Sequence, residues 1–598
     1  MFAYYVIPFC TGVLALLTVC TIKFTKWIRR LDKHQLITLK KNILSNKIFY
    51  SIWEIIREGL LHIKISKHHP LLGYMHRSLA FGWFLLIAVG FVQTMFAYPN
   101  GHQFYISIFF NYFEPRSPHI QHHEFDSLMA NIMDLLLIYV LSGLILAMVK
   151  SVWSKPLGMK RTTKLNLTDR VAKFSLWAIF PLRLLAESST SAIYENGGFL
   201  ISFIGSAFSH IGLTSVIFEY NCWLLYSLAL GTFFCLMPFS RYMHIFTEML
   251  LIIFRNWGVC ETEKKTGYTY VELSACSRCG ICIDRCPINK HLGDSSIQGV
   301  YMLQTIRNKD LWNKAERIAN NCMMCDQCVV ECPVGIDLST IRTQVRASYN
   351  KEIDNISAYE YLNKVHHFNA IGRIAYFGGC MSHLTPGITN AMETIFTAAG
   401  QKYWYIDKDK TICCGRPLRQ QGLAHQANEL KRKNTELIKN SGATMLVTSC
   451  PICYQSFKKE YNLKIPVMHH TEYIENLIKK KTITVDKSAL RVTYHDPCEL
   501  GRGCGIFDQP RNILEQTSTL VKTQEEREKS ICCGYNLGNI SISNRQQAII
   551  RDAAINNLTA PSPDLIATAC PMCKKALSRG TATPVKDIAE IVVELIKS

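Results

Sequence analysis

The sequence predicts a multidomain protein: an all-α anchor of five transmembrane helices, a helical cysteine-rich segment and a pair of duplicated α/β domains. Three observations predict this class. Apolar stretches of about 20 residues, the length that crosses a bilayer as a helix, recur up to residue 239. Nineteen of the 24 cysteines follow residue 270 in tight groups, which is metal-ligand spacing. The last groups occur twice, 118 to 120 residues apart, which indicates a tandem duplication.

The anchor is predicted from hydropathy. Four stretches are apolar all round and predict spans, at residues 2–22, 78–98, 128–149 and 222–239. No small-residue cleavage site follows the first stretch, so we expect a retained helix and not a signal peptide. Residues 171–194 predict a fifth helix, in which Arg183 and Glu187 stand four residues apart and can pair on one helical face.

The basic residues predict the orientation of the anchor. Residues 23–67 carry eleven Lys and Arg and residues 150–173 carry seven, whereas residues 99–127 carry one and residues 191–220 none. Because short cytoplasmic loops retain basic residues, we expect the N-terminus outside and the cysteine-rich part on the cytoplasmic side of the inner membrane. This distribution accounts for much of the net charge of +20, and basic residues near the bilayer also attract membrane lipid. The charge therefore does not require a nucleic acid partner.

Two histidines are candidates for a haem b site. His76 begins the predicted second helix, and His244 follows the last one in a Pro-x-Ser-Arg-x-x-His motif. They could hold a haem between them, or they could contact lipid headgroups. This pattern resembles the cytochrome b subunits of nitrate reductase gamma type. Relatives with two haems have a second ligand on each helix, where this chain has Leu86 and Tyr226. The resemblance therefore implies a single inner haem b, with quinone as partner at a site that the motif does not locate.

The first cysteine groups are two complete runs of C-x2-C-x2-C-x3-C-P. Their cysteines are Cys276, Cys279, Cys282 and Cys286, then Cys322, Cys325, Cys328 and Cys332. Such runs resemble bacterial ferredoxins, where three cysteines bind one cubane [4Fe–4S] cluster and the fourth reaches the other. We therefore expect Cys332 to complete the first set and Cys286 the second. Structural zinc is the alternative, but zinc favours two separated CxxC pairs. The insert at residues 288–321 reads as helical.

The duplicated module has five cysteines in each copy. They are Cys380, Cys413, Cys414, Cys450 and Cys453 in the first copy, and Cys498, Cys532, Cys533, Cys570 and Cys573 in the second. Short apolar runs before these groups, at residues 374–377, 445–447, 491–494 and 565–567, predict strands. Residues 423–439 and 546–557 predict helices between them. The cysteines are then expected at the carboxyl ends of strands, where open α/β sheets bind ligands.

The module is identified as the CCG domain of the heterodisulfide reductase catalytic subunit. The resemblance implies two non-cubane [4Fe–4S] clusters held by the ten cysteines, with a disulfide cleaved between them. His495, just before the Asp-Pro-Cys of the second copy, is a candidate proton donor to a departing thiolate. The neighbouring Arg502 and Arg511 are interpreted equally well as surface residues or as substrate contacts.

The predicted domains are a transmembrane cytochrome b-like anchor (1–257), a two-cluster ferredoxin domain (258–365) and two CCG domains (366–485 and 486–598). The predicted function is electron transfer between quinone and a thiol/disulfide couple, in which the disulfide is small or protein-borne. The alternative is a non-catalytic electron conduit that serves a separate flavoprotein. A flavin or nucleotide site within the chain is not expected, because no GxGxxG opens a βαβ unit.

Overall fold

A computed structural model describes residues 4–97, 109, 124–153, 165–262, 264–293, 299–307, 315–349, 372–409 and 412–597. The chain divides into two compact units, Met1–Gly280 and Ile281–Ser598. The predicted anchor ends earlier, at residue 257. The difference arises because α12 (Gly267–Ala275) packs against α11 (His244–Asn256) and α1 (Ile7–Arg29) of the first unit. The predicted boundary at residues 365 and 366 lies outside the described residues.

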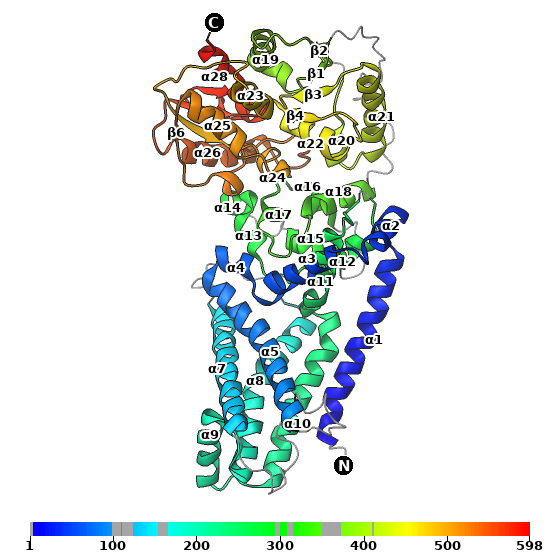
Figure 1. Ribbon diagram of the computed structural model, residues 1–598, viewed down its shortest axis with the longest axis vertical. Helices are drawn as coiled ribbons and strands as arrows, with labels where there is room; N and C mark the ends of the chain where they lie inside the picture. Colours follow the sequence, from blue (N-terminus) through cyan, green and yellow to red (C-terminus); the bar gives the residue numbers. More distant parts are fainter. Residues whose placement is uncertain are drawn as a thin grey trace. The chain divides into compact units, whose positions relative to one another are not determined.

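The first unit is helical throughout its described residues (Figure 1). Its other helices are α2 (Lys33–Asn42), α3 (Lys47–Glu54), a π-helical turn (Ile55–Leu60), α4 (Ile63–His68), α5 (Pro70–Ala97), α7 (Glu124–Val152), α8 (Leu167–Tyr194), α9 (Phe199–His210) and α10 (Val216–Leu236). Four described segments are long and apolar enough to cross a membrane: Tyr4–Arg29, Pro70–Val92, Leu128–Val152 and Val216–Phe239.

The predicted fifth span forms as helix α8 but is not among those four segments. Its predicted ion pair is confirmed, since Nε of Arg183 lies 2.8 Å from Oε1 of Glu187 and both side chains are buried. The helices pack closely, with α10 against both α8 and α1, and α5 against α7. Where α1 and α10 cross, a Cβ on Gly12 would clash with the backbone of Gly231, so two glycines permit this approach.

The second unit begins with short helices. They are α13 (Ile281–Arg285), α14 (Pro287–Leu292), α15 (Gly299–Arg307), α16 (Glu316–Asn320), α17 (Gln327–Val330) and α18 (Leu338–Tyr349). The described part of the insert at residues 288–321 is thus largely helical, as its sequence predicts.

Two four-stranded parallel sheets follow, with the orders β2-β1-β3-β4 and β6-β5-β7-β8. The strands are β1 (Ile374–Phe377), β2 (Tyr403–Tyr405), β3 (Met445–Thr448), β4 (Val467–His469), β5 (Arg491–His495), β6 (Thr519–Val521), β7 (Leu565–Thr568) and β8 (Val585–Asp587). The sequence predicts the four central strands correctly. It misses the four edge strands, which have only three residues each and no long apolar run.

Helices connect and cover the strands in each repeat (Figure 1). They are α19 (Pro386–Ala398), α20 (Arg416–Gln420), α21 (Ala424–Asn440), α22 (Pro451–Lys459) and α23 (His470–Lys479) in the first repeat, and α24 (Gly501–Cys504), α25 (Asp508–Thr517), α26 (Asn544–Thr559), α27 (Pro571–Leu577) and α28 (Ile588–Leu595) in the second. The predicted helices at residues 423–439 and 546–557 correspond to α21 and α26.

The two repeats share an apolar core, and a buried polar contact between His470 and Asp587 also joins them. Helices α19 and α23 of the first repeat pack against α28 of the second, and residues of both repeats form a continuous buried cluster. His469 and Asp587 cap α23 and α28 at equivalent positions, each in a capping box with a glutamate. Nε2 of His470 lies 2.9 Å from Oδ1 of Asp587, and neither side chain is exposed.

Candidate metal centres

The first CCG cysteine set lies at the carboxyl ends of the two central strands. Cys380 follows β1 and Cys450 follows β3, the neighbouring strands between which the strand order reverses. Its five thiols form a continuous series of hydrogen bonds, in the order Cys380, Cys413, Cys414, Cys453 and Cys450. The structure therefore brings together all five cysteines of the first copy, with Cys380 exposed and three others buried.

The second set repeats this arrangement after β5 and β7. Its thiols are linked in the matching order Cys498, Cys532, Cys533, Cys573 and Cys570. All are buried except Cys498, which is partly exposed. The two sets are neighbours, because Cys450 of the first interacts electrostatically with Cys570 of the second.

In each Cys-Cys pair, the pKa of the second cysteine is lowered. Hydrogen bonds from Cys413 and Cys453 lower the pKa of Cys414 to about 6. Those from Cys532 and Cys573 hold the pKa of Cys533 well below its ordinary value. Because the thiolate is the form that binds metal, Cys414 and Cys533 are the readier donors of their pairs, whereas the pKa values of Cys413 and Cys532 are raised.

The backbone at the first set also suits a bulky group. Gly379 has a φ of +89°, and a Cβ there would stand 2.8 Å from Cβ of Cys450 and 3.1 Å from Sγ of Cys453. Any other residue would therefore be strained and would intrude among the cysteines.

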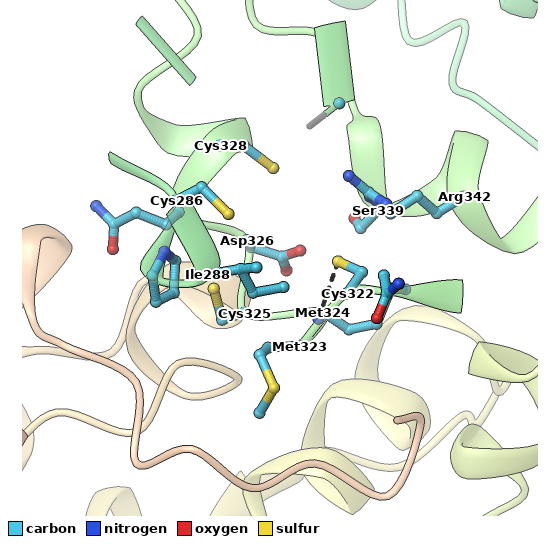
Figure 2. A pocket seen from close by; sticks show the side chains of 14 residues that line it. Cys286, Ile288, Cys322, Met323, Met324, Cys325, Asp326, Cys328, Ser339 and Arg342 are labelled. Carbon is cyan, nitrogen blue, oxygen red and sulfur yellow. Dashed lines mark hydrogen bonds between the residues drawn. The ribbon is translucent and has the colours of Figure 1, made fainter. Parts of the chain in front are cut away.

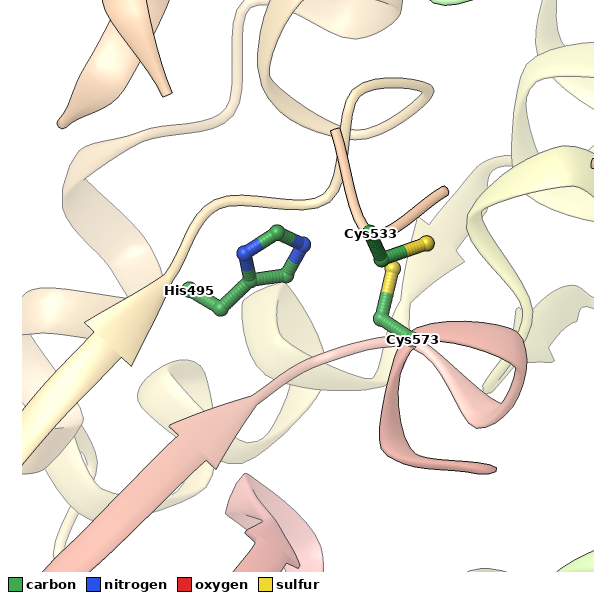
Figure 3. Close-up of side chains that lie close together, drawn as sticks. All are labelled: His495, Cys533 and Cys573. Atoms are coloured by element: carbon green, nitrogen blue, oxygen red, sulfur yellow. The ribbon is translucent and has the colours of Figure 1, made fainter. Parts of the chain in front are cut away.

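His495 is the candidate residue that distinguishes the two sets. Ligand atoms of His495, Cys533 and Cys573 all lie within 4.8 Å of one another, as Figure 3 shows, and all three residues are buried. His495 ends β5, three residues before Cys498, and Phe377 occupies the matching position three residues before Cys380. The first repeat thus presents a phenyl ring where the second presents an imidazole.

Four of the ferredoxin cysteines line one pocket. Figure 2 shows Cys286, Cys322, Cys325 and Cys328 around it, which is the combination expected for the second cubane cluster. The guanidinium of Arg342 lies in the same pocket, and its Nε is buried without a hydrogen-bond partner among the described residues. A buried cation beside four thiols suits an anionic cluster.

The two ferredoxin loops share an unusual backbone. The second and fourth residues after the first cysteine are left-handed in both runs: Arg278 and Gly280 in one, Met324 and Asp326 in the other, with φ between +49° and +89°. Alternation of right-handed and left-handed residues turns successive N–H groups inward and makes an anion-binding nest. One such group, the N–H of Met324, already points at Sγ of Cys322 at 3.3 Å.

In the other predicted set, Cys276 and Cys279 belong to the first compact unit and Cys282 and Cys332 to the second.

The pocket of the second ferredoxin run lies beside the second CCG cysteine set. Cys325 and Cys532 are hydrogen-bonded, and both belong to a buried cluster with Cys286 and Cys498 at its edge. Arg502 joins the two groups, since its Nε donates to the carbonyl of Cys325 at 2.7 Å and its Nη1 to that of Ser530 at 2.8 Å.

Comparisons with known proteins agree with these centres. A family described as a cysteine-rich domain (CCG) matches residues 374–458 and 492–578, and a 4Fe-4S dicluster domain matches residues 272–336. The D component of the dihydromethanophenazine:CoB–CoM heterodisulfide reductase of Methanosarcina acetivorans is 26% identical over 401 residues, covering 56% of this chain and 96% of the relative. The chain is thus similar to the D component of heterodisulfide reductase, with the cysteine-rich and 4Fe-4S domains of an iron–sulfur protein.

Two further relatives are similar to the chain. The D component of the same enzyme from Methanosarcina barkeri is 25% identical over 405 residues, covering 56% of this chain and 97% of the relative. The EtfAB:quinone oxidoreductase of Syntrophomonas wolfei is 23% identical over 469 residues, covering 60% of this chain and 66% of the relative.

Sequence reasoning missed a buried ionic network between the two CCG repeats. Arg416, just after the first Cys-Cys-Gly, pairs with Glu499 at 2.9 Å and with Glu460 at 2.8 Å. Glu499 directly follows Cys498, so the network connects the loops of both CCG sets. The sequence does carry a signal for this network, because Arg416 and Glu499 are charged residues of opposite sign that each directly follow a cysteine motif.

Three other charged residues also stand at the cysteine loops. Asp407 accepts hydrogen bonds from the N–H groups of Gly378 and Gly379, and burial raises its pKa to about 7. Arg511 is buried and pairs with Asp496 at 2.7 Å. The surface interpretation is therefore wrong for Arg511, whereas Arg502 is half-buried and donates to backbone carbonyls.

The two candidate haem histidines lie in the first unit. His76 is in α5 and interacts electrostatically with His244, the first residue of α11. Nδ1 of His244 lies 2.8 Å from the carbonyl oxygen of Arg241, a contact of the kind that orients ligand histidines. The ring of His62 stacks on that of His76 at 5.2 Å between centroids. Leu86 and Tyr226 are both buried in the apolar core of this unit.

Proposed function

We propose that the protein is a membrane-bound thiol:disulfide oxidoreductase that exchanges electrons between the quinone pool and a disulfide. Reduction of one disulfide to two thiols takes up two electrons and two protons, which is what oxidation of one quinol to quinone releases.

The observation that carries the proposal is the completeness of both CCG sets. Each set has five cysteines in one series of contacts, and the two sets adjoin at Cys450 and Cys570. The ten cysteines would hold two non-cubane [4Fe–4S] clusters. Bound there, these clusters would supply the electron pair and iron sites with affinity for sulfur. A protein that only relays electrons does not need two complete, adjacent sets.

The ferredoxin cysteines would hold two cubane [4Fe–4S] clusters. Cys286, Cys322, Cys325 and Cys328 would hold the one beside Arg342, and Cys276, Cys279, Cys282 and Cys332 the other. The protein's own part is to exclude water and to compensate the negative charge with the guanidinium groups of the buried Arg342 and the half-buried Arg502.

His495 is proposed to hold the proton that a departing thiolate needs. Its imidazole is buried beside Cys533 and Cys573, within reach of a sulfur atom that occupies the space between them. The matching Phe377 cannot serve in this way, so proton delivery is assigned to the second repeat.

The first unit is proposed to be a five-helix anchor with its N-terminus outside and its cysteine loops in the cytoplasm. His76 and His244 would hold one haem b, which relays single electrons between quinone and the clusters. The proposal is supported by the electrostatic contact between the two histidines and by the basic loops that join the apolar helices.

The test is anaerobic EPR spectroscopy of the purified full-length protein during a redox titration, with and without added thiol. The proposal expects cubane signals together with signals of non-cubane clusters that change when thiol binds. Cys533→Ala should remove one non-cubane signal and the disulfide reductase activity, while Cys504→Ala, outside the ten, should retain both. Only cubane signals in the native protein would refute catalysis at the CCG sets.

A second candidate is an electron conduit that delivers electrons from a separate flavoprotein to quinone. The resemblance to the EtfAB:quinone oxidoreductase favours it. Purification of a stoichiometric complex that contains flavin, without disulfide reductase activity, would place this function first.

A further inference from the structure

Helix α3 carries its aromatic face outward. Phe49, Tyr50 and Trp53 are 70%, 71% and 59% exposed, whereas Ser51, between them in sequence, is 1% exposed. A helix on a water-facing surface has the opposite distribution, with its apolar stripe toward the core. A contiguous apolar surface of this kind marks a site of interaction.

The polar edge of α3 fixes this orientation. Oε2 of Glu54 accepts a hydrogen bond from the side-chain amide of Asn256 at 2.8 Å, and Oε1 of Glu54 lies 3.8 Å from Arg255. Asn42, the last residue of α2, donates to the carbonyl of Trp257 at 2.9 Å. These partners lie at or next to the end of α11, so the packing of α3 on α11 leaves its aromatic face uncovered.

In the chain, α3 lies between two candidate spans, and it packs on a helix that follows a third. It follows α1, whose span ends at Arg29, and it precedes the span that begins at Pro70. Helix α11, on which it packs, begins five residues after the span that ends at Phe239. Helix α3 itself is not a candidate span, and it is therefore expected at the level where the spans leave the bilayer.

Basic residues accompany the apolar surface. The exposed apolar residues continue from α3 into α2 and the turn between them: Ile37, Ile43, Leu44, Ile48 and Ile52. Lys33, Lys40, Lys41 and Lys47 are exposed along the same segment. Tryptophan and tyrosine prefer the headgroup level of a membrane, and lysines near a bilayer attract anionic lipids.

We propose that residues 33–54 form an interfacial membrane-binding segment. Phe49, Tyr50 and Trp53 insert between the lipid headgroups at the bilayer surface where α1 ends, and the four lysines bind anionic phospholipid. The occupant of the aromatic face is therefore lipid. This inference depends on membrane insertion of the candidate spans and not on the proposed redox chemistry.

The test is photo-crosslinking of the full-length protein in nanodiscs of phosphatidylglycerol and phosphatidylcholine. Benzoylphenylalanine replaces Phe49 in one variant and Leu490 in a control, because Leu490 is also exposed, at 44%, but belongs to the second unit. We expect a phospholipid adduct at position 49, identified by mass, several-fold above the control. A yield equal to the control, or an adduct to a second copy or another protein, would overturn the proposal.

A charge variant tests the lipid class. Lys40→Glu, Lys41→Glu and Lys47→Glu together should lower the phosphatidylglycerol adduct at position 49 several-fold and leave the EPR signals of the clusters unchanged. An undiminished phosphatidylglycerol adduct would contradict the role of the lysines. Because the cluster signals are read separately, failure of this inference is distinguishable from failure of the redox function.

Discussion

Asp169, at the start of α8, forms a buried ion pair with Arg278 of the first ferredoxin run. Its other carboxylate oxygen accepts the backbone N–H of Arg241 at 2.7 Å. One carboxylate thus connects the Cys276–Cys279 loop to the motif that precedes His244. Lys150 of α7 interacts electrostatically with Cys279, so two charged residues of the anchor meet this loop. The first ferredoxin loop is therefore built into the anchor unit.

Removal of this carboxylate should be strongly destabilising. Asp169→Asn leaves the buried, positively charged Arg278 uncompensated, and loss of one partner of a buried pair costs about 3 to 5 kcal/mol. Thermal unfolding of the purified protein should show the loss. Glu429→Gln breaks the exposed pair with Arg432, and the loss of this solvent-screened pair should leave the unfolding temperature nearly unchanged. Equal effects of the two substitutions would contradict the structural role of Asp169.

Cys322→Ala should lower the bound iron by about one cluster of four atoms, because Cys322 is one of four cysteines in the Arg342 pocket. Iron analysis and EPR spectroscopy measure the change. The matched variant Cys504→Ala alters a partly buried cysteine six residues after Cys498, and its iron content should equal that of the native protein. Full iron content in Cys322→Ala would refute the assignment.

Neutralisation of Arg502 should lower the reduction potential of the neighbouring clusters. Its guanidinium interacts with Cys325, Cys498 and Cys532, and a nearby positive charge favours the reduced, more negative state of a cluster. Arg502→Gln is compared with Arg491→Gln, which changes an exposed arginine at the opposite end of β5. EPR-monitored redox titration should show a lower potential for the first variant and the native value for the second.

Glu248→Gln should change how stability depends on pH. Burial in α11 raises the pKa of Glu248 to about 7, and the carboxylate of Glu58 acts in the same direction. With a folded pKa above the unfolded one, the native protein loses stability as pH rises from about 4.5 to about 7. The glutamine variant should lack this loss and be more stable at pH 8, by at most about 3 kcal/mol. Thermal unfolding across this pH range measures it, and identical pH profiles would contradict the shift.

Strong local patterns allowed much of the fold to be predicted. The central strands β1, β3, β5 and β7 are buried apolar runs, and the long helices α21 and α26 have clear periodicity. The edge strand Tyr403–Tyr405 has no such signal, because its pairing with β1 depends on residues far away in sequence. The anchor is harder to predict at α8, where the buried Arg183 and Glu187 lower the hydropathy that identifies a span.

The cysteine sets were likewise predictable from spacing, as the contacts within each CCG set show. Their surroundings were not. The pairing of Arg416 with Glu499 joins residues of different repeats, and one carbonyl contact of Arg502, with Cys325, comes from the ferredoxin segment. Such partners depend on how the chain folds back, which no local pattern encodes.

The exchange of Phe377 for His495 between matching positions has a consequence for the history of the module. A duplicated domain starts with two interchangeable halves, yet here the second half alone has the imidazole at this position and has Cys532 in contact with Cys325 of the ferredoxin segment. A chimaera with two first repeats would keep the parallel sheets but lose both features. The two halves therefore share a fold but surround their cysteine sets differently, so a copy of one half cannot reproduce the contacts of the other.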